Sequence, residues 1–416
     1  VNVEQPSPLR VAPRCPHFGV CGGCRWQHVG YAAQLEFKRQ HVVDAFERIG
    51  GFEHPEVLPV IGSDAQYFYR NKMEYSFSDR QWFDTRHPEW YLHAPDEEPP
   101  SLFLGLHVAQ RYDKVLDIAE CHLQSDLSNR ILRFTRAFVR RRRLSVHIPR
   151  RDEGYLRFLV IRPSARTADV MVNLVTFDDR PDLLQEYAGE LRAECPEVTT
   201  VVNTINRRKA QIAFGEETRI VFGPGAIRER LGKFTFEISA GSFFQTNTAQ
   251  AERLYGVAEE FAELNGGETV YDLYSGTGSI ALFVSERAGR VVGVEAVESA
   301  IHDAERNVRL NGVANCTFVL GDLKDRLTRD VGWMTSHARP DVLIVDPPRS
   351  GMHPKVMEEI VRLQVPRIVY VSCNPATQAR DVKLLCLDTY RLVKLQPVDM
   401  FPHTSHIENV CQLVLK

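Results

Sequence analysis

The chain has 416 residues, enough for two or three domains with separate cores, and its 44% hydrophobic and 25% charged residues are ordinary for a globular protein. No apolar run approaches the roughly 20 residues needed to span a bilayer and no secretory signal opens the chain, so we expect a cytoplasmic protein with no membrane partner. The net charge of -3 excludes nucleic-acid recognition by bulk charge, but not by a local basic cluster.

The first 30 residues are rich in Cys, Gly and Pro and show no helical or strand period. Cys15, Cys21 and Cys24 follow one another at Cys-x5-Cys-x2-Cys spacing, in a chain whose nine cysteines fit a reducing compartment. We therefore expect metal ligation rather than disulfides, with Cys121 as the candidate for a fourth ligand. The spacing alone leaves both an iron–sulfur cluster and a zinc ion open, because each accepts four thiolates.

A helix and then a sheet are predicted in the next 200 residues or so. Apolar residues recur at helical spacing within residues 31–54, until Gly50-Gly51 ends the helix, which we expect to dock on the C-terminal domain. These apolar residues are Leu35, Val42, Val43, Phe46 and Ile49. Residues 55–235 indicate an α+β domain with a mostly antiparallel sheet and one helix near 126–143. Its expected strands span residues 69–78, 102–108, 155–163, 169–176 and 199–206.

From residue 236 to residue 416, apolar strands alternate with amphipathic helices. The expected strands span residues 269–273, 291–295, 316–320, 342–346 and 368–372. This alternation indicates an α/β fold with a parallel, doubly wound, Rossmann-like sheet. Such sheets bind ligands beyond the carboxyl ends of their strands, and the informative residues of this region fall at those ends.

Four of these strand ends carry glycines or carboxylates. Residues 272–279 (DLYSGTGS) follow one strand and open a helix, and the glycines allow a tight turn close to a ligand. Glu295, Asp322 and Asp346 stand at the next three ends. The alternatives are polar caps or a nicotinamide site, but the latter does not explain the Asp-Pro-Pro-Arg turn at 346–349. We interpret the ends as an S-adenosylmethionine site, with Glu295 on the ribose and Asp322 near the adenine.

A thiol and a carboxylate indicate the type of reaction. Cys373 follows an apolar strand and precedes Asn-Pro, and Glu408 lies further on in His-Ile-Glu-Asn-Val. A thiol nucleophile and a possible base near a cofactor site favour carbon methylation of a pyrimidine. The alternatives are a buried structural cysteine and a carboxylate that only caps a strand or faces solvent.

Five motifs occur in order along the chain: GSFFQTN (241–247), DLYSGTGS (272–279), DPPRSG (346–351), SCNP (372–375) and HIE (406–408). Together they resemble the RNA (uracil-C5)-methyltransferase family, whose members form 5-methyluridine in ribosomal and transfer RNA. The match runs from about Cys15 to the C-terminus. It implies a class I methyltransferase fold for the C-terminal domain. It also implies a [4Fe-4S] cluster on Cys15, Cys21, Cys24 and Cys121. Because the Cys-x3-Cys-x2-Cys spacing of radical enzymes is absent, a structural or RNA-facing cluster is expected.

The resemblance also implies roles for individual side chains. Those expected around the cofactor are Gln245, Tyr274, Ser279, Glu295, Asp322 and Asp346. Ser279 stands where relatives commonly have Asn. Phe243 would stack on the target base, and Arg349 is expected to contact it.

The chemistry follows from the reactivity of uracil, whose C5 is a poor nucleophile until a group adds at C6. The Cys373 thiolate would add there, and C5 of the resulting enolate would take the methyl group from the cofactor sulfonium. Glu408 would then remove the C5 proton, so that elimination expels Cys373. The target base must leave any stack to be reached.

Two other methyl transfers share parts of this pattern. Asp-Pro-Pro followed by an aromatic residue is typical of exocyclic amino methylation, but Arg349 stands in that place and no thiol is needed. DNA cytosine methyltransferases also have Glu-Asn-Val, as at 408–410, yet their nucleophile follows a proline. Here Cys373 precedes Asn374-Pro375, so we treat the shared tripeptide as coincidence.

RNA contacts are expected from basic and aromatic residues in the first half of the chain. The densest basic stretch comprises Arg136, Arg140 to Arg143, Arg150 and Arg151, which could neutralise phosphates or form a solvated helix face. The aromatic candidates for stacking on bases are Trp26, Tyr67, Tyr69 and Phe77, with core packing as the alternative. Many family members carry an extra N-terminal RNA-binding β-barrel, and this chain starts near the point where it would end.

We therefore predict a monomeric cytoplasmic enzyme with an iron–sulfur segment (1–30), a docking helix (31–54), an RNA-binding central domain (55–235) and a methyltransferase domain (236–416). The predicted reaction is S-adenosylmethionine-dependent methylation of uracil C5 in RNA. 23S ribosomal RNA is favoured, because the cysteine cluster accompanies the ribosomal enzymes more than the bacterial transfer-RNA enzyme. The alternatives are the same reaction on transfer RNA and a non-catalytic iron–sulfur RNA-binding protein. Binding alone would need neither Cys373 nor Glu408.

Overall fold

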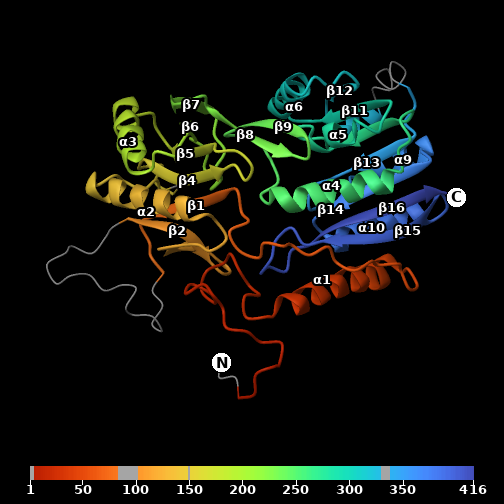
Figure 1. Cartoon of the computed structure of the whole chain (residues 1–416), viewed down its shortest axis with the longest axis horizontal. Helices are drawn as coiled ribbons and strands as arrows, with labels where there is room; N and C mark the ends of the chain where they lie inside the picture. The colour runs from red at the N-terminus through yellow and green to blue at the C-terminus, as the bar shows by residue number, and fades with distance from the viewer. Residues whose placement is uncertain (1–3, 83–101, 149, 329–337) are drawn as a thin grey trace. The chain divides into compact units, whose positions relative to one another are not determined.

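The computed structural model describes residues 4–82, 102–148, 150–328 and 338–416. The chain forms two units, each built on a seven-stranded sheet (Figure 1). Unit 1 comprises Val1–Val29, Ala65–Glu229 and Ile238–Gly241, and unit 2 comprises Gly30–Asp64, Arg230–Glu237 and Ser242–Lys416. These limits differ from the predicted ones, because residues 4–29 fold with the central region. Within the described ranges, no helix is both long and apolar enough to cross a membrane.

Unit 1 contains a mostly antiparallel sheet in the order β3-β2-β1-β4-β5-β6-β7. Its strands are β1 (Met73–Ser78), β2 (Phe103–Val108), β3 (Arg111–Asp117), β4 (Leu156–Pro163), β5 (Val170–Thr176), β6 (Thr200–Ile205) and β7 (Glu217–Phe222). β5 and β6 are parallel, because a helix returns the chain between them. A hairpin of β8 (Ala226–Leu231) and β9 (Phe234–Ser239) forms a separate two-stranded sheet.

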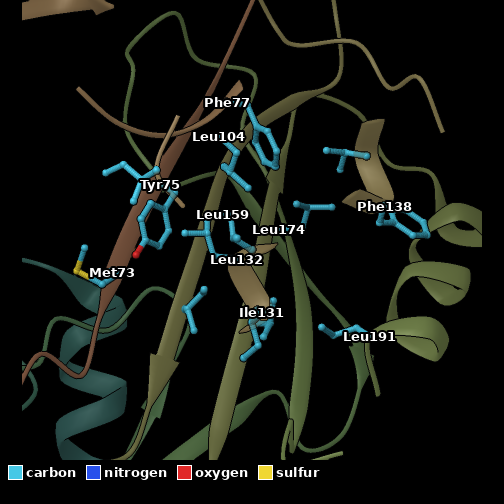
Figure 2. Close-up of a cluster of buried hydrophobic side chains, with 14 of the residues drawn as sticks. Met73, Tyr75, Phe77, Leu104, Ile131, Leu132, Phe138, Leu159, Leu174 and Leu191 are labelled. Atoms are coloured by element: carbon cyan, nitrogen blue, oxygen red, sulfur yellow. The ribbon is translucent and has the colours of Figure 1, made fainter. Parts of the chain in front are cut away.

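Two helices supply apolar side chains to the core of unit 1. α2 (Asp126–Arg141) begins after Ser125, whose hydroxyl accepts the N–H of Ser128 as a helix cap. α3 (Pro181–Glu194) is the crossover between β5 and β6, and the prediction of a single helix in this region is wrong. Its buried residues Leu184, Tyr187, Ala188 and Leu191 do follow helical spacing. Figure 2 shows Leu191 in one cluster with side chains of α2 and of the sheet.

Unit 2 contains a sheet in the order β12-β11-β10-β13-β14-β16-β15. Its strands are β10 (Thr269–Leu273), β11 (Arg290–Glu295), β12 (Cys316–Leu320), β13 (Val342–Val345), β14 (Arg367–Ser372), β15 (Tyr390–Val398) and β16 (Glu408–Leu415). The first five are parallel, as the alternation of strands and helices predicts. β16 is antiparallel to both of its neighbours, and this last pair of strands was not predicted.

Helices cover the sheet of unit 2. They are α1 (Tyr31–Ala45), α4 (Thr248–Ala262), α5 (Ser279–Val284), α6 (Glu298–Leu310), α7 (Leu323–Thr328), α9 (Pro354–Leu363) and α10 (Pro375–Cys386). α1 continues as a single π-helical turn, Phe46–Gly50, and ends at Gly51 in the left-handed conformation, as predicted (φ 73°). Side chains of α1, α9 and α10 share one core with the strands, whereas α4 packs against β13 to β16.

The buried side of α1 differs from the predicted apolar stripe. Ile49, which the stripe included, is 44% exposed. The buried side chains of α1 are Gln34, Lys38, Val42 and Ala45. Two of these four are polar, so the face that packs inward carries little apolar periodicity for a sequence pattern to detect.

Candidate active site

The carboxyl ends of the parallel strands of unit 2 meet at one edge of the sheet. The register pairs Leu273 with Val294 on one side and with Val345 on the other. Residues that directly follow these strands therefore lie at a common edge, where sheets of this type bind ligands. β16 runs in the opposite direction, so its first residue, Glu408, begins at the same edge.

Strand pairing brings Cys373 and Glu408 together. Ser372, the last residue of β14, lies opposite Asn409 of β16, so the residues next to them, Cys373 and Glu408, are also neighbours. Gln378 of α10 fixes this pairing, since its Nε2 donates to backbone carbonyls of β14 and β16 (2.7 and 3.1 Å). The side-chain amide of Asn409 donates back to Gln378 Oε1 at 2.7 Å.

Burial and charge shift the protonation of this pair. Burial raises the pKa of the half-buried Cys373 thiol and the Glu408 carboxylate raises it further, whereas the Arg349 guanidinium lowers it. Glu408 is 6% exposed, and burial together with Asp346 holds the pKa of its carboxyl well above the usual range. Burial also raises the pKa of Asp346 to about 7. A carboxylate with a raised pKa accepts a proton more readily than an ordinary one, which suits a general base.

Arg349 is the cation of this group. Its Nη2 donates to Nδ1 of His406 at 2.8 Å, which places the imidazole proton on Nε2. The backbone carbonyl of Arg349 accepts from Asn374 Nδ2 (3.1 Å) and Thr377 Oγ1 (3.2 Å), so the Asp-Pro-Pro-Arg turn is tied to the start of α10. His406 belongs to a predicted motif, but its contact with Arg349 was not predicted.

A pocket of about 500 Å³ opens beside Cys373. It is lined by His41, Ala45, Arg349, Cys373, Asn374, Pro375, Ala376, Ser405, His406 and Ile407. The volume suits a nucleotide, and the polar part of the wall offers a guanidinium and two imidazoles. α1 contributes part of this wall, which was not expected from the sequence.

The glycine-containing loop after β10 has the close turns that its sequence predicts. Tyr274 adopts a left-handed backbone conformation (φ 67°), which is uncommon outside glycine and occurs at functional sites. Gly278 is also left-handed, and a Cβ there would lie 2.7 Å from the ring of Phe318. The loop is held by Glu295, whose Oε2 accepts the N–H of Gly276 at 2.9 Å. Glu295 Oε1 accepts the backbone N–H groups of the two residues that follow it, Ala296 and Val297, at 2.8 and 2.9 Å.

Two residues to which the prediction assigned no role lie among these groups. Asp272 is fully buried, and burial and Asp346 hold the pKa of its carboxyl well above the usual range. One of its oxygens accepts the N–H of Ala281 at 3.1 Å, and the other has no partner among the described residues. Tyr255 pairs its hydroxyl with that of Ser279 at 3.0 Å. An acidic residue inside an apolar strand was a signal for Asp272, but nothing in the sequence indicated Tyr255.

The other predicted ligand-contacting residues lie on segments around the same edge. Phe243 is 64% exposed, and its carbonyl accepts the hydroxyl of Thr277 in the glycine-containing loop at 3.3 Å. Gln245 is buried just before α4. Asp322 is exposed and accepts the N–H of Lys324 at 2.9 Å. Burial, followed by the charge of Asp322, raises the pKa of Tyr274 to about 12, so these two side chains lie within electrostatic range.

The four cysteines predicted as metal ligands belong to unit 1. Gly22 donates its N–H to the His107 carbonyl of β2 at 2.9 Å, and a Cβ at Gly22 would meet that oxygen at 2.8 Å. Cys121 is held by Asn129 of α2, whose Oδ1 accepts the Cys121 N–H at 2.8 Å. Burial raises the pKa of Cys15 and Cys21 to about 12 and that of Cys24 to about 11, and each of these three is raised further by Cys121.

These thiols are close enough to interact electrostatically, yet they do not form a metal-ready cage. In the part of the chain that the structure describes, no group of three or more His, Cys, Asp or Glu side chains is arranged to hold a metal ion. All nine cysteines are free thiols in this structure. Polar N–H donors already point at the sulfurs: Gly23 donates to Cys21 Sγ at 3.4 Å.

Most of the predicted basic stretch is paired within unit 1. Arg136 and Arg140 form ion pairs with Asp117 at 2.9 and 2.8 Å, and Arg141 pairs with Glu190 of α3. The stretch therefore presents less free charge than its sequence indicates. Of the aromatic candidates for base stacking, Tyr69 and Phe77 are buried, which agrees with core packing, and Trp26 and Tyr67 are partly exposed.

Known proteins resemble this chain over its whole length. The family described as tRNA (uracil-5-)-methyltransferase matches residues 158–416, more than half of the chain. An uncharacterized RNA methyltransferase of Porphyromonas gingivalis is 45% identical, covering 100% of this chain and 89% of that protein. One from Chlorobaculum tepidum is 43% identical over 99% of this chain and 84% of that protein.

A solved structure agrees with this match. The crystal structure of Pyrococcus abyssi tRNA (uracil-54, C5)-methyltransferase in complex with S-adenosyl-L-homocysteine is 32% identical to this chain, with a TM-score of 0.74. It covers 99% of this chain and 88% of that one. The chain belongs to the RNA (uracil-C5)-methyltransferase family. The predicted class I methyltransferase fold is confirmed, and the alternative of a non-catalytic RNA-binding protein is wrong because the family consists of enzymes.

Proposed function

We propose that this enzyme methylates C5 of a uridine in RNA with S-adenosylmethionine, using Cys373 as the nucleophile and Glu408 as the base. The observation that carries the proposal is the pairing of these two residues across β14 and β16, at the edge of the sheet where the cofactor loop also lies. Neither a binding module nor a methyltransferase acting on an amino group needs a thiol paired with a buried carboxylate.

The residues at this edge fit the cofactor. S-adenosylmethionine, when bound, supplies an electrophilic methyl group on a sulfonium. Tyr274 and the glycines after it would approach it closely, Glu295 would accept from the ribose, and Asp322 would lie near the adenine. Asp346 and Gln245 would complete the site. The Ser279 hydroxyl already pairs with Tyr255, so its contact with the cofactor would have to share that hydroxyl.

The protein groups then act in a defined order. The Cys373 thiolate, favoured by the Arg349 guanidinium, adds to C6 of uracil, and the electron pair moves to C5, which takes the methyl group. Glu408 accepts the proton from C5, the C5–C6 double bond re-forms, and the C6–S bond breaks to return the thiolate. Phe243, exposed beside the loop, would stack on the base, and Arg349 would contact it.

We also propose that Cys15, Cys21, Cys24 and Cys121 hold a [4Fe-4S] cluster in the complete enzyme. The support is the set of four interacting thiols and the N–H groups that already donate to sulfur, since such hydrogen bonds tune clusters of this kind. Because these thiols are not arranged as a ready metal site, the segment at 15–24 would have to close around the cluster. A structural or RNA-facing role is proposed for it.

Ribosomal RNA is the proposed substrate, because of the four cysteines, and we expect the enzyme to act as a monomer in the cytoplasm. Transfer RNA is the second candidate, since the Pyrococcus abyssi protein that this chain resembles is named as acting on uracil-54 of transfer RNA. The two candidates share all of the chemistry above and differ in how unit 1 would recognise RNA.

The test is tritium transfer from labelled S-adenosylmethionine to RNA. Unmodified 23S ribosomal RNA and unmodified transfer RNA are each offered, and the product nucleoside is identified by mass spectrometry. We expect 5-methyluridine at one position of ribosomal RNA. Label in another nucleoside would overturn the assigned reaction, whereas 5-methyluridine confined to transfer RNA would replace the substrate and leave the reaction standing.

A second experiment tests the order of steps. Glu408→Gln should still add to C6 and transfer the methyl group, because the base acts afterwards, and so should accumulate a protein–RNA adduct that survives denaturing electrophoresis. RNA with 5-fluorouridine should trap the unmodified enzyme in the same way, because fluorine cannot leave as a proton does. If neither trap gives an adduct on Cys373, the covalent mechanism is wrong.

A further inference from the structure

The loop at residues 399–407 connects β15 to β16 and leads directly into Glu408. It also carries His406, the partner of Arg349. Glu408 is paired with Val398 of β15, and the loop joins these two residues, so the way the loop is held affects the position of Glu408 together with the strand pairing. Besides the buried apolar residues Met400 and Ile407, several buried polar side chains hold this loop.

Three of these side chains come from one face of α1. Tyr31, Gln34 and Lys38 are three and four residues apart, so they project from the helix on the same side. Gln34 and Lys38 have no exposed surface. They are the polar residues that made the inward face of α1 differ from its predicted apolar stripe.

The three side chains contact both ends of a short segment of the loop. Lys38 Nζ donates to Asp399 Oδ1 at 2.5 Å and to the Phe401 carbonyl at 3.1 Å. The Tyr31 hydroxyl donates to Asp399 Oδ2 at 2.8 Å. Gln34 Oε1 accepts the backbone N–H of His403 at 2.9 Å, and its Nε2 lies 3.2 Å from Nδ1 of the same residue. His403 is left-handed (φ 67°), a conformation that persists where the surroundings enforce it.

The start of α4 holds the same segment from a second helix. Asn247 Nδ2 donates to the Met400 carbonyl at 3.1 Å, and Gln250 Nε2 donates to the Asp399 carbonyl at 2.9 Å. α4 follows the segment that carries Phe243 and Gln245. The loop before the base is thus fastened between α1 and the element that follows the predicted base-stacking and cofactor residues.

Stability alone does not account for this arrangement. A buried ion pair such as Lys38–Asp399 loses most of its attraction to desolvation, and apolar residues of similar volume often stabilise a protein equally well or better. What polar contacts provide and apolar contacts do not is direction, because each hydrogen bond fixes one atom of the loop. Geometry of this kind matters most beside a reacting group, where a displacement of about 1 Å can cost about 100-fold in rate.

We propose that Tyr31, Gln34 and Lys38 are positioning residues for Glu408, which set the carboxylate in place to take the proton from C5. This inference rests on the proposed function and deepens it. Cys373 follows β14 and is not part of the loop, although Gln378 ties β14 to β16 and so helps to hold both residues. Loosening the loop should therefore slow removal of the proton more than it slows addition of the thiolate.

The test uses the full chain with two variants. Gln34→Leu removes the contacts with His403 and leaves no charge behind. The double variant Lys38→Met/Asp399→Asn removes the ion pair without leaving a buried charge, and so it keeps the test open if one variant folds poorly. Each is given RNA with ordinary or C5-deuterated uridine at the target position. The denaturation-resistant adduct and the isotope effect on its decay are measured.

In both variants we expect at least about a five-fold rise in the adduct and a larger deuterium isotope effect, because proton removal becomes limiting. Val42→Ala is the matched control, since Val42 is fully buried on the same helix in the apolar core and its side chain has no polar group that could hydrogen-bond to the loop. Urea unfolding places all variants on one scale of stability.

The outcomes separate this inference from the proposed function. If the isotope effect of both loop variants equals that of the unmodified enzyme, or that of Val42→Ala at equal stability, the positioning role is wrong. If the unmodified enzyme itself forms no adduct with 5-fluorouridine RNA, the proposed mechanism fails, and the positioning role fails with it.

Discussion

Glu229 of unit 1 and Glu408 of unit 2 are both buried, but their carboxylates have opposite hydrogen-bonding environments. Glu229 in unit 1 is 1% exposed and accepts hydrogen bonds from the Ser164 hydroxyl (3.0 Å) and from two backbone N–H groups (2.6 and 3.0 Å). Glu408 in unit 2 receives no hydrogen bond from the described residues, and neither does the neighbouring Asp346. A satisfied carboxylate stabilises its surroundings, whereas an unsatisfied one costs free energy. In unit 2 this unfavourable free energy arises at the edge of the sheet, where the reaction is proposed.

The thiols differ in a parallel way. Cys373 has a guanidinium that favours its thiolate, together with carboxylates that oppose it. Burial is the main cause that raises the pKa of the four thiols of unit 1, and Cys121 raises the pKa of the other three further. Backbone N–H groups lower the pKa of Cys15, Cys21 and Cys121, and the Arg70 guanidinium lowers that of Cys24 and Cys121. Arg349 favours the thiolate of Cys373, and Arg70 acts on two of the four thiols of unit 1, so ionising all four together would need further positive charge, which the proposed cluster would supply. The thiol of Cys373 and the four thiols of unit 1 therefore lie in different electrostatic surroundings.

The largest expected effects test that distinction. Cys373→Ala should lower methyl transfer by about 1,000-fold or more, since a lost nucleophile removes the covalent route, while leaving the metal content unchanged. Cys121→Ala should have the opposite effect: it should release the iron and leave the affinity for S-adenosylmethionine unchanged. Tritium transfer, metal analysis and calorimetry measure the three quantities.

The control for both variants is Cys195→Ala, because Cys195 is a buried cysteine of unit 1 that no proposal uses. It should change neither the iron content nor the activity. About four irons per chain are expected in anaerobically prepared protein. One zinc and no iron would keep the ligands and overturn the cluster, and unchanged metal in Cys121→Ala would exclude that residue as a ligand.

Sequence patterns predicted the parallel strands because each is a short, mostly apolar run that alternates with an amphipathic helix. They missed β15 and β16, whose antiparallel pairing departs from the alternation of strand and helix. That register is also what sets Glu408 beside Cys373. From the sequence alone, Cys373 and Glu408 were paired on the basis of the family resemblance and the expected chemistry. The residues around each of them give no sign that the two lie close together.

Contacts between distant residues were beyond any local pattern. Lys38 and Asp399 are 361 positions apart, and the apolar stripe predicted for α1 gave no reason to bury a lysine. The contacts of Tyr255 with Ser279 and of His406 with Arg349 were missed for the same reason, because a hydroxyl–hydroxyl or imidazole–guanidinium contact leaves no periodicity in the sequence. The glycines of the cofactor loop were predictable, since their close turns need a residue without a side chain.

A smaller effect is expected at Asp346, and it tests whether carboxylates of unit 2 cost stability. The folded-state pKa of about 7 exceeds the unfolded value of about 3.9, so the folded protein binds more protons between these values. Stability must then fall as the pH rises through this window, by up to about 4 kcal/mol. Asp346→Asn should remove that loss and gain more stability at pH 8 than at pH 5, as measured by urea unfolding.

The matched variant is Glu229→Gln in unit 1. Because its carboxylate accepts several hydrogen bonds, its replacement should lower the stability at both pH values rather than raise it. If Asp346→Asn loses stability at pH 8 as Glu229→Gln does, the contrast between the two units is wrong. The Asp346 carboxylate would then stabilise the fold through a contact of its own.

The smallest expected effect concerns Glu295, a carboxylate of unit 2 that resembles Glu229 in being well hydrogen-bonded. Oε1 already accepts two backbone N–H groups, and Oε2 accepts one from Gly276, which leaves room on Oε2 for a ribose hydroxyl. Glu295→Gln should weaken binding of S-adenosylhomocysteine by about 1–3 kcal/mol, the cost of an unpaired polar group, without abolishing the fold. Calorimetry measures the affinity, with Glu298→Gln at the start of α6 as a nearby control. Equal affinity in both variants would mean that the ribose does not lie at the end of β11, and that Glu295 holds the loop and nothing more.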